Sequence, residues 1–234
     1  MIFRHFAVVC FAIVLAVTVV GCASVSGGRI SGVNWALAKN GGSVSTFSEE
    51  PEYPASTLID GITVPDDWDK EGAGWKAQIA SGGMTRSSRA QRDEQEKNWV
   101  IIELSQPVTV NEVKVYTTDS EKYPANKFGV SDLLVQYEMK TATNDLLWAN
   151  AKRPGRSIND QDDAIRNNIY GVIDARFEPV TTQKIRLLIY ATNDVSMTNG
   201  GKSREGVIRV SEVEVYGSGK LKSRNEVDEL FNSN

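Results

Sequence analysis

Apolar and polar residues alternate along several short stretches of this chain, in the manner of β-strands. The cleanest example is 208–216, where apolar residues at 208, 210, 213 and 215 stand among polar ones. Similar stretches cover 99–104, 108–116, 133–137, 169–177 and 185–190. A period of two with many β-branched residues is typical of strands that bury one face, and this spacing predicts an antiparallel sandwich or barrel.

Two local features modify this pattern. The alternation in 108–116 slips in phase near Asn111 and Glu112. Within the β-rich region, the only helical signal is a short one at Pro54–Ile59, with proline in its first turn. No stretch carries a long apolar stripe of period 3.6, so the sequence predicts an all-β domain.

A different pattern marks the start of the chain. Residues 6–20 form an uncharged apolar run that follows Arg4 and ends in small residues, which is the layout of a secretory signal. The run is shorter than the roughly 20 apolar residues that a spanning helix needs. Cys22 directly follows Gly21 and so resembles the lipobox cysteine of bacterial lipoproteins. That resemblance implies cleavage after residue 21, acyl chains on Cys22 and retention on a membrane surface. An ordinary cleaved signal with an incidental cysteine is the alternative.

The remainder of the chain divides into three parts. Residues 22–33 are the lipidated cysteine and a Ser/Gly-rich tether, 34–217 form one domain, and 218–234 are a polar tail. Removing 1–21 from the 234 residues leaves 213, a length that fits one all-β domain or two small ones and is enough for a sizeable core.

Composition restricts the chemistry of this domain. The chain has one histidine, His5, and two cysteines, Cys10 and Cys22; two of these lie in the signal and the third is assigned to lipid. A disulfide framework, a zinc site and histidine-based catalysis are therefore excluded from the domain. The charge of the chain without residues 1–21 is 25 Lys+Arg (26 minus Arg4) against 30 Asp+Glu, or −5, which argues against a nucleic-acid partner. We do not expect an enzyme.

Six blocks of the domain resemble, in order, the motifs of the coagulation factor V/VIII type C, or discoidin, domains. The blocks are 34–39 (NWALAK), 53–61 (YPASTLIDG), 99–104 (WVIIEL), 109–116 (TVNEVKVY), 184–187 (KIRL) and 211–217 (SEVEVYG). Bacterial members of this family are called family 32 carbohydrate-binding modules. The resemblance implies a galactose-binding-like jelly-roll β-sandwich, a single domain with long polar loops at 66–98, 152–167 and 193–206.

The resemblance also implies a structural calcium ion. Family members commonly hold calcium in the loop after the "DG" motif, closed by a glutamate of the last strand. The matching positions here are Asp60 and Glu212, with Asp66 as a further ligand. Calcium prefers six to eight oxygen ligands, from carboxylates and backbone carbonyls on an irregular loop. The alternative interpretation is a plain turn at Asp60 and a solvated strand residue at Glu212.

Aromatic and polar residues of the loops are the candidates for ligand binding. Trp75 stands between glycines and polar residues, outside any strand pattern, so it is expected to be exposed and to stack on a sugar ring. Tyr123 and Arg86 are the next candidates, for stacking and for hydrogen bonds to hydroxyl groups. Trp99 and Trp148 fall in predicted strands and are expected in the core.

Three classes of function remain open at this stage. The first is a lipid-anchored protein that captures carbohydrate without catalysis, on the bacterial cell envelope and with the outer membrane favoured over the inner. The second is an envelope interaction or assembly factor that uses the same loops to bind a protein. The third, ranked last, is a carboxylate-based hydrolase. Adjacent carboxylates such as those at 66 and 67 do not form the opposed pair that a glycosidase needs.

Overall fold

The computed structural model describes residues 32–65, 67–79, 98–155, 163–198, 203–219 and 221, without the side chains of 195–198 and 203–205. The signal peptide, Cys22, most of the tether and most of the tail lie outside these ranges, as do Asp66 and Arg86. Within them, no helix is long and apolar enough to cross a membrane.

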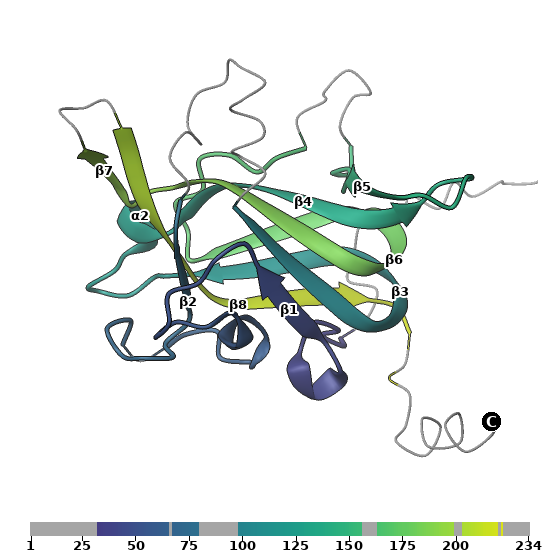
Figure 1. Cartoon of the computed structure of the whole chain (residues 1–234), viewed down its shortest axis with the longest axis horizontal. Helices are drawn as coiled ribbons and strands as arrows, with labels where there is room; N and C mark the ends of the chain where they lie inside the picture. Colours follow the sequence, from purple (N-terminus) through teal and green to yellow (C-terminus); the bar gives the residue numbers. More distant parts are fainter. Residues whose placement is uncertain are drawn as a thin grey trace, which may run out of the picture.

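The described residues form an antiparallel β-structure with very little helix (Figure 1), as the alternation predicts. The sheet path runs β2-β8-β3-β6-β4-β5, while β1 pairs with β3 and β7 with β8. The strands are β1 Ser43–Thr46, β2 Trp75–Gln78, β3 Trp99–Thr117, β4 Val130–Lys140, β5 Leu146–Asn150, β6 Val172–Thr192, β7 Val195–Thr198 and β8 Ser203–Gly217. The helical turns are η1 Ala38–Asn40, η2 Ala55–Ile59 and α2 Ala125–Phe128.

Several predicted strands are parts of longer ones. The stretches 99–104 and 108–116 belong to the single strand β3, and 185–190 belongs to β6, which also takes in 172–177. The phase slip near Asn111 is a register shift between Val110 and Glu112, and a second shift separates Glu103 from Val108. Such bulges bend a strand and increase its twist, so β3 lines the core along both of its halves. The predicted helix at 54–59 is a 3-10 helix, η2.

One apolar cluster fills the space between the inward faces of the sheet. Its members come from both halves of β3 and from β2, β4, β6 and β8, and η2 adds Leu58 and Ile59. A smaller cluster on the outward face joins Leu134, Ala164 and Leu188, and Trp99 packs against it. The prediction that Trp99 and Trp148 lie in the core is therefore wrong. Trp99 lies half-buried on the outer face, and Trp148 lies half-buried on β5, which has β4 on one side only.

Candidate functional site

The structure brings Asp60 and Glu212 together although 151 positions separate Gly61 from Glu212. Asp60 ends η2, and Gly61 follows with φ of 94°, a conformation that favours glycine. The Gly61 N–H donates to Glu212 Oε2 at 3.0 Å. Glu212 lies on β8 and is fully buried, so the reading of it as a solvated strand residue is wrong.

The electrostatics of this pair are unusual for carboxyl groups. Burial, together with the neighbouring carboxyl groups of Asp60 and Glu214, raises the pKa of Glu212 to about 8, against the opposing effect of the Gly61 N–H hydrogen bond. Burial also raises the pKa of Asp60. Within the described part of the chain, Glu212 Oε1 has no hydrogen-bond partner. A buried carboxyl oxygen without a donor is what a bound cation would satisfy.

The surrounding oxygens fit a hard cation such as calcium. A cleft of about 230 Å³ lies beside the pair and is lined by Asp60, Ile62, Asp67 and Ser211 among others. The irregular loop 60–65 offers backbone carbonyls, of which that of Thr63 accepts the Ser211 hydroxyl at 2.7 Å. The described residues contain no group of three or more acidic, histidine or cysteine side chains that could hold a metal. Asp60 and Glu212 would therefore share the ion with carbonyl groups.

Trp75 is not an exposed loop residue, and the prediction that it stacks on a ligand is wrong. It begins strand β2, where it pairs with Val210 of β8, and its side chain is fully buried. Its Nε1 donates to the Ser48 carbonyl at 3.0 Å, and its ring meets Phe47 edge-on at 6.3 Å. The nearby Gly74 serves packing, because a Cβ there would lie 2.5 Å from the ring of Trp68.

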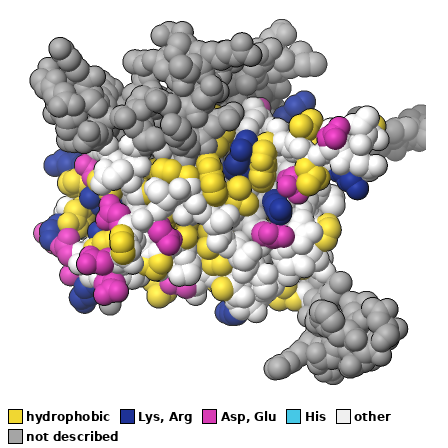
Figure 2. Space-filling view, in the orientation of Figure 1, with side chains coloured by type: hydrophobic (Ala, Val, Ile, Leu, Met, Phe, Trp, Pro, Cys, Tyr) yellow, Lys and Arg dark blue, Asp and Glu magenta, His cyan; other side chains and the backbone are white. Residues whose placement is uncertain are grey.

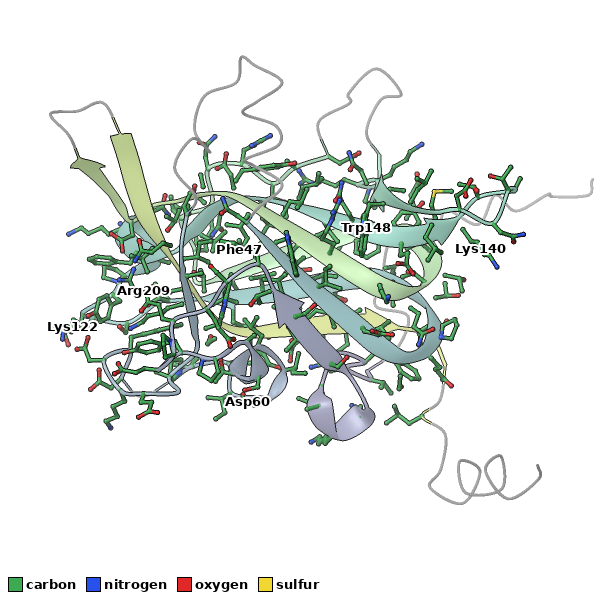
Figure 3. All side chains as sticks on the ribbon, viewed as in Figure 1. Phe47, Asp60, Lys122, Lys140, Trp148 and Arg209 are labelled. Atoms are coloured by element: carbon green, nitrogen blue, oxygen red, sulfur yellow. The ribbon has the colours of Figure 1, made fainter. Side chains whose placement is uncertain are left out.

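Tyr123 lies at one end of the sandwich, within a polar network. Its hydroxyl donates to Asp69, which also forms an ion pair with Lys122. These contacts with Lys122 and Tyr123 hold the pKa of Asp69 below its usual value, and the bond to Asp69 raises the pKa of Tyr123. The Tyr123 ring also meets Phe128 edge-on at 5.2 Å. Figure 3 labels Lys122 at the left end of the molecule, where Figure 2 shows acidic and basic side chains gathered.

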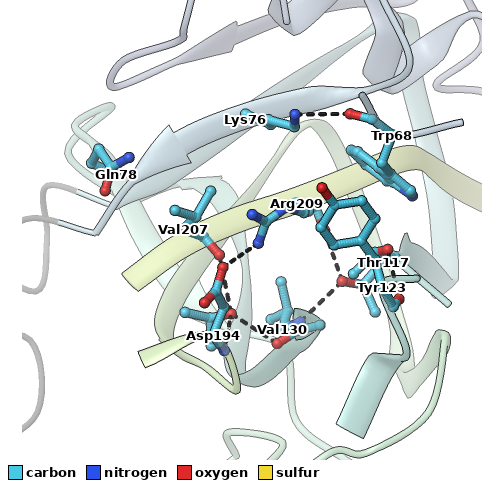
Figure 4. A network of polar contacts seen from close by, with 12 residues as sticks. Trp68, Lys76, Gln78, Thr117, Tyr123, Val130, Asp194, Val207 and Arg209 are labelled. Atoms are coloured by element: carbon cyan, nitrogen blue, oxygen red, sulfur yellow. Dashed lines mark hydrogen bonds and ion pairs between the residues drawn. The ribbon is translucent and has the colours of Figure 1, made fainter. Parts of the chain in front are cut away.

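Arg209 completes this network, and the sequence analysis did not select it. Its guanidinium lies over the Tyr123 ring at 5.2 Å from the centroid and forms an ion pair with Asp194 (Figure 4). Its carbonyl accepts the Thr117 hydroxyl at 2.7 Å. The alternation in β8 indicates only that Arg209 faces away from the core. Its side chain is only 12% exposed, because loops distant in sequence pack over it.

A second cleft, of about 140 Å³, opens beside this network. It is lined by Thr63, Val64, Pro65, Trp68, Tyr116, Thr117, Asp119, Ser120, Gly171 and Val172. Three parts of the chain meet here: residues 63–65 with Trp68, the start of the loop that follows β3, and the turn that leads into β6. A Cβ at Gly171 would lie 2.4 Å from that of Asp119, so glycine permits the close approach of the last two.

Tyr170, next to this cleft, is a strongly exposed aromatic side chain that the sequence analysis missed. The alternation predicts a strand at 169–177, but β6 begins at Val172 and Tyr170 is 70% exposed. Its backbone is fixed on both sides by Asn168, whose Nδ2 donates to the Tyr170 carbonyl at 2.8 Å and whose Oδ1 accepts from the Tyr170 N–H at 3.3 Å. Asn168 also donates to the Val130 carbonyl at 2.9 Å. The Asn-Ile-Tyr-Gly sequence is a turn signal that could have identified it.

We refer to this end of the molecule as the loop end. It comprises Asp69, Asp119, Lys122, Tyr123, Tyr170 and Arg209 with the 140 Å³ cleft. Of the predicted site residues, the structure places Tyr123 here and Asp60 with Glu212 at the neighbouring turn. Trp75 is buried and does not belong to the loop end.

No protein-family model and no curated protein matches this chain. Several solved structures, however, resemble it. The family 32 carbohydrate-binding module of Streptococcus pneumoniae EndoD superposes with a TM-score of 0.51 at 17% identity, over 80% of this chain and all of that one. A fucose-binding module of Streptococcus pneumoniae gives 0.47 at 13% identity, over 80% and 96%. The family 32 module of C. perfringens NanJ, solved with galactose, gives 0.44 at 14%, over 79% and 99%.

The EndoD comparison covers the whole of the matched module and 80% of this chain. The chain therefore has the discoidin-like, galactose-binding-like jelly-roll β-sandwich fold of the family 32 carbohydrate-binding modules.

Proposed function

We propose that this protein binds carbohydrate without catalysis, through the loop end of its sandwich. The observation that carries the proposal is Tyr170, an exposed aromatic ring on a hydrogen-bonded turn beside a cleft whose walls include Asp119 and Ser120. The fold likeness to a family 32 carbohydrate-binding module supports it. The lack of histidine and cysteine in the domain supports a binding role over an enzymatic one.

The loop end offers both kinds of contact that a sugar requires. The Tyr170 ring supplies a flat apolar face for the C–H side of a pyranose ring. Asp119 and Ser120 line the cleft and supply oxygens for hydroxyl groups. The Asp119 carboxylate is oriented by the Ala125 N–H, which donates to it at 3.2 Å. A shallow site of this size buries little area, so we expect a weak affinity for a single sugar.

Calcium has a structural part in this proposal. Asp60 and Glu212 would hold it with carbonyl groups of the loop 60–65, and the ion would supply positive charge to a buried carboxylate. The Ser211 hydroxyl already ties that loop to β8 through the Thr63 carbonyl. A filled site would then brace Val64 and Pro65, which line the loop-end cleft.

The proposed setting is the bacterial envelope, with the protein exported and lipid-anchored through Cys22. The first described residues join the sheet at the far end of β8 from its loop-end half, because Asn34 bridges to Tyr216 and the Trp35 N–H bonds to the Val215 carbonyl. The attachment point of the proposed tether is therefore separate from the loop end. The partners are a glycan and the membrane.

The test is a glycan array followed by titration calorimetry. The ligands include galactose, fucose and N-acetylgalactosamine, and the protein is the full-length chain in detergent. Tyr170→Ala is expected to weaken binding about tenfold, equal to about 1.4 kcal/mol. Ile169→Ala is the matched control, since its side chain is 53% exposed and adjacent in sequence. Neither change is expected to alter the melting temperature, because both side chains face solvent.

Two outcomes would contradict different parts of the proposal. Binding that Tyr170→Ala leaves unchanged would place the carbohydrate site elsewhere on the molecule. An array on which the chain retains no glycan at all would reject carbohydrate as the ligand and favour the envelope-protein partner, to be sought by pull-down from envelope extract.

A further inference from the structure

Strand β5 ends the sheet at the opposite end of the molecule from Lys122 (Figure 3). It pairs with β4 alone among the described strands, so one of its edges carries no strand in this part of the chain. An edge of this kind presents backbone N–H and C=O groups to any chain that approaches in extended form.

The composition of β5 does nothing to block such pairing. Its sequence, LLWAN, contains no charge, glycine or proline. Leu146 and Leu147 point to opposite faces of the sheet and are 60% and 54% exposed, and Met139 beside them on β4 is 39% exposed. Proteins usually protect edges with charged residues or proline. Another short edge strand, β1, exposes Ser43 and Ser45 instead.

The hydrogen bonds to β4 determine which backbone groups of β5 point outward. The Ala151 N–H bonds to the Val135 carbonyl at 2.9 Å, and the Thr141 N–H bonds to the Asp145 carbonyl at 2.9 Å. Hydrogen-bonded pairs alternate along an antiparallel ladder, so residues 147 and 149 also turn their backbone groups toward β4. Residues 146, 148 and 150 therefore direct theirs to the free edge.

We propose that two copies of this chain pair through β5, antiparallel and symmetric about Trp148. In that register Trp148 meets its own copy, and residue 146 of each copy meets residue 150 of the other. Every outward-facing backbone group of β5 then finds an outward-facing group of the partner strand. A two-fold axis requires this self-complementary arrangement, and the sheet would continue from one copy into the next.

The charges that flank β5 agree with a second copy as the occupant. Asp145 precedes the strand, and Lys152 and Arg153 follow it. In the antiparallel register, residue 145 of one copy lies opposite residue 151 of the other, one position from Lys152. The acidic start of each strand thus lies beside the basic end of its partner, at both ends of the pair.

Cysteine cross-linking tests this register directly. Hydrogen-bonded antiparallel pairs have Cα atoms about 5.5 Å apart, inside the range of about 4.4–6.8 Å that a disulfide spans. Trp148→Cys in the full-length chain, in detergent under mild oxidation, is expected to give mainly covalent dimer that reductant reverses. Ser45→Cys on the polar edge strand β1 is the matched control, and the unaltered chain gives the background from Cys10 and Cys22. Cross-linking of Trp148→Cys no greater than that of Ser45→Cys would overturn the proposal.

A charge swap provides a second test that does not depend on oxidation. Trp148→Lys and Trp148→Glu each place like charges opposite one another at the two-fold axis, so each variant alone is expected to show the molar mass of one copy by light scattering. A mixture of the two is expected to form dimer, because opposite charges then meet. Circular dichroism and melting curves show whether each variant is folded. A wild-type chain that stays monomeric at every concentration would reject the pairing of two copies. So would a monomeric Trp148→Cys variant whose thiol does not react with maleimide. That second result would indicate that another segment of the same chain covers β5.

Discussion

The carboxyl group of Glu212 shows how burial decides the state of a single residue. Its pKa is raised to about 8, against a usual value near 4.5, because the side chain is buried and carboxyl groups lie close by. Without a cation the folded protein therefore holds a proton at Glu212 at neutral pH, and the unfolded chain does not. The proton stabilises the fold fully below about pH 4.5, and this stabilisation is lost as the pH rises to about 8.

We expect this to appear in chemical denaturation with excess chelator. The free energy of unfolding should fall between pH 5 and pH 8, with a slope of at most about 1.4 kcal/mol per pH unit from this group. Glu212→Gln should remove that part of the slope, because the amide does not titrate. Adding calcium at pH 8 should stabilise the wild type, by about 2.7 kcal/mol at 100 times the dissociation constant, and should have no effect on Glu212→Gln.

A matched control lies nearby on the same strand. Glu214 accepts a hydrogen bond from the Tyr116 hydroxyl at 2.8 Å and is not part of the proposed calcium site, so Glu214→Gln should keep the calcium response. It should keep most of the pH slope, because burial, the main cause of the raised Glu212 pKa, is unchanged and only the smaller contribution of the Glu214 charge is lost. An equal calcium response in Glu212→Gln and in the wild type would reject the site at Glu212.

At the scale of elements, β2 depends on Trp75. The strand has four residues, and its first side chain fills the space between β8 and the Phe47 segment. Trp75→Ala should lower the free energy of unfolding by about 3–5 kcal/mol, because it removes a fully buried aromatic side chain. Trp75→Phe should cost less. The midpoint and slope of urea unfolding, monitored by far-ultraviolet circular dichroism, measure both effects.

This prediction separates packing from binding. The molecules of Trp75→Ala that remain folded should bind glycan as the wild type does, because the ring is inaccessible to a ligand. A normal unfolding midpoint together with lost glycan binding would instead assign Trp75 to the ligand site.

At the scale of the whole molecule, three features lie at separate places. The loop end carries Lys122 and Arg209, β5 closes the far edge of the sheet, and the chain enters the domain beside Tyr216 (Figures 1 and 3). A dimer through β5 would present two loop ends. Two weak sites on one particle bind a repetitive glycan far more tightly than one when the geometry permits both to engage.

The lipid anchor is also a property of the whole molecule. Cys22→Ser should abolish acylation, measured by incorporation of labelled palmitate in the bacterial host, and should shift the protein from the detergent phase toward the aqueous phase. Gly27→Ser in the tether leaves the cysteine in place and should behave as the wild type. Retention of label by Cys22→Ser would show that Cys22 is not the acylated residue.

The sequence by itself determined the main stretches of the long strands β3, β4, β6 and β8 and the faces of these strands, but not the short strands β1, β2 and β7. Alternation decides which side chains of a strand turn inward, so 108–116, 133–137 and 208–216 were identified with the bulge near Asn111 included. The ordered blocks that resemble discoidin domains identify Asp60 and Glu212 as candidate ligands. The fold brings the two residues together, since the N–H of Gly61, next to Asp60, donates to Glu212.

Only the tertiary structure decided which residues are accessible. Trp75 has loop-like neighbours in sequence but is buried because β8 and the segment around Phe47 cover it. Tyr170 has strand-like neighbours but is exposed because the turn at Asn168 precedes β6. Likewise, the LLWAN pattern of β5 suits a core strand, and its exposure follows from its place at the end of the sheet order. The local sequence pattern determines toward which face of a strand a side chain points. Whether that side chain is buried depends on residues far away in sequence that pack on it, and the local pattern holds no information about them.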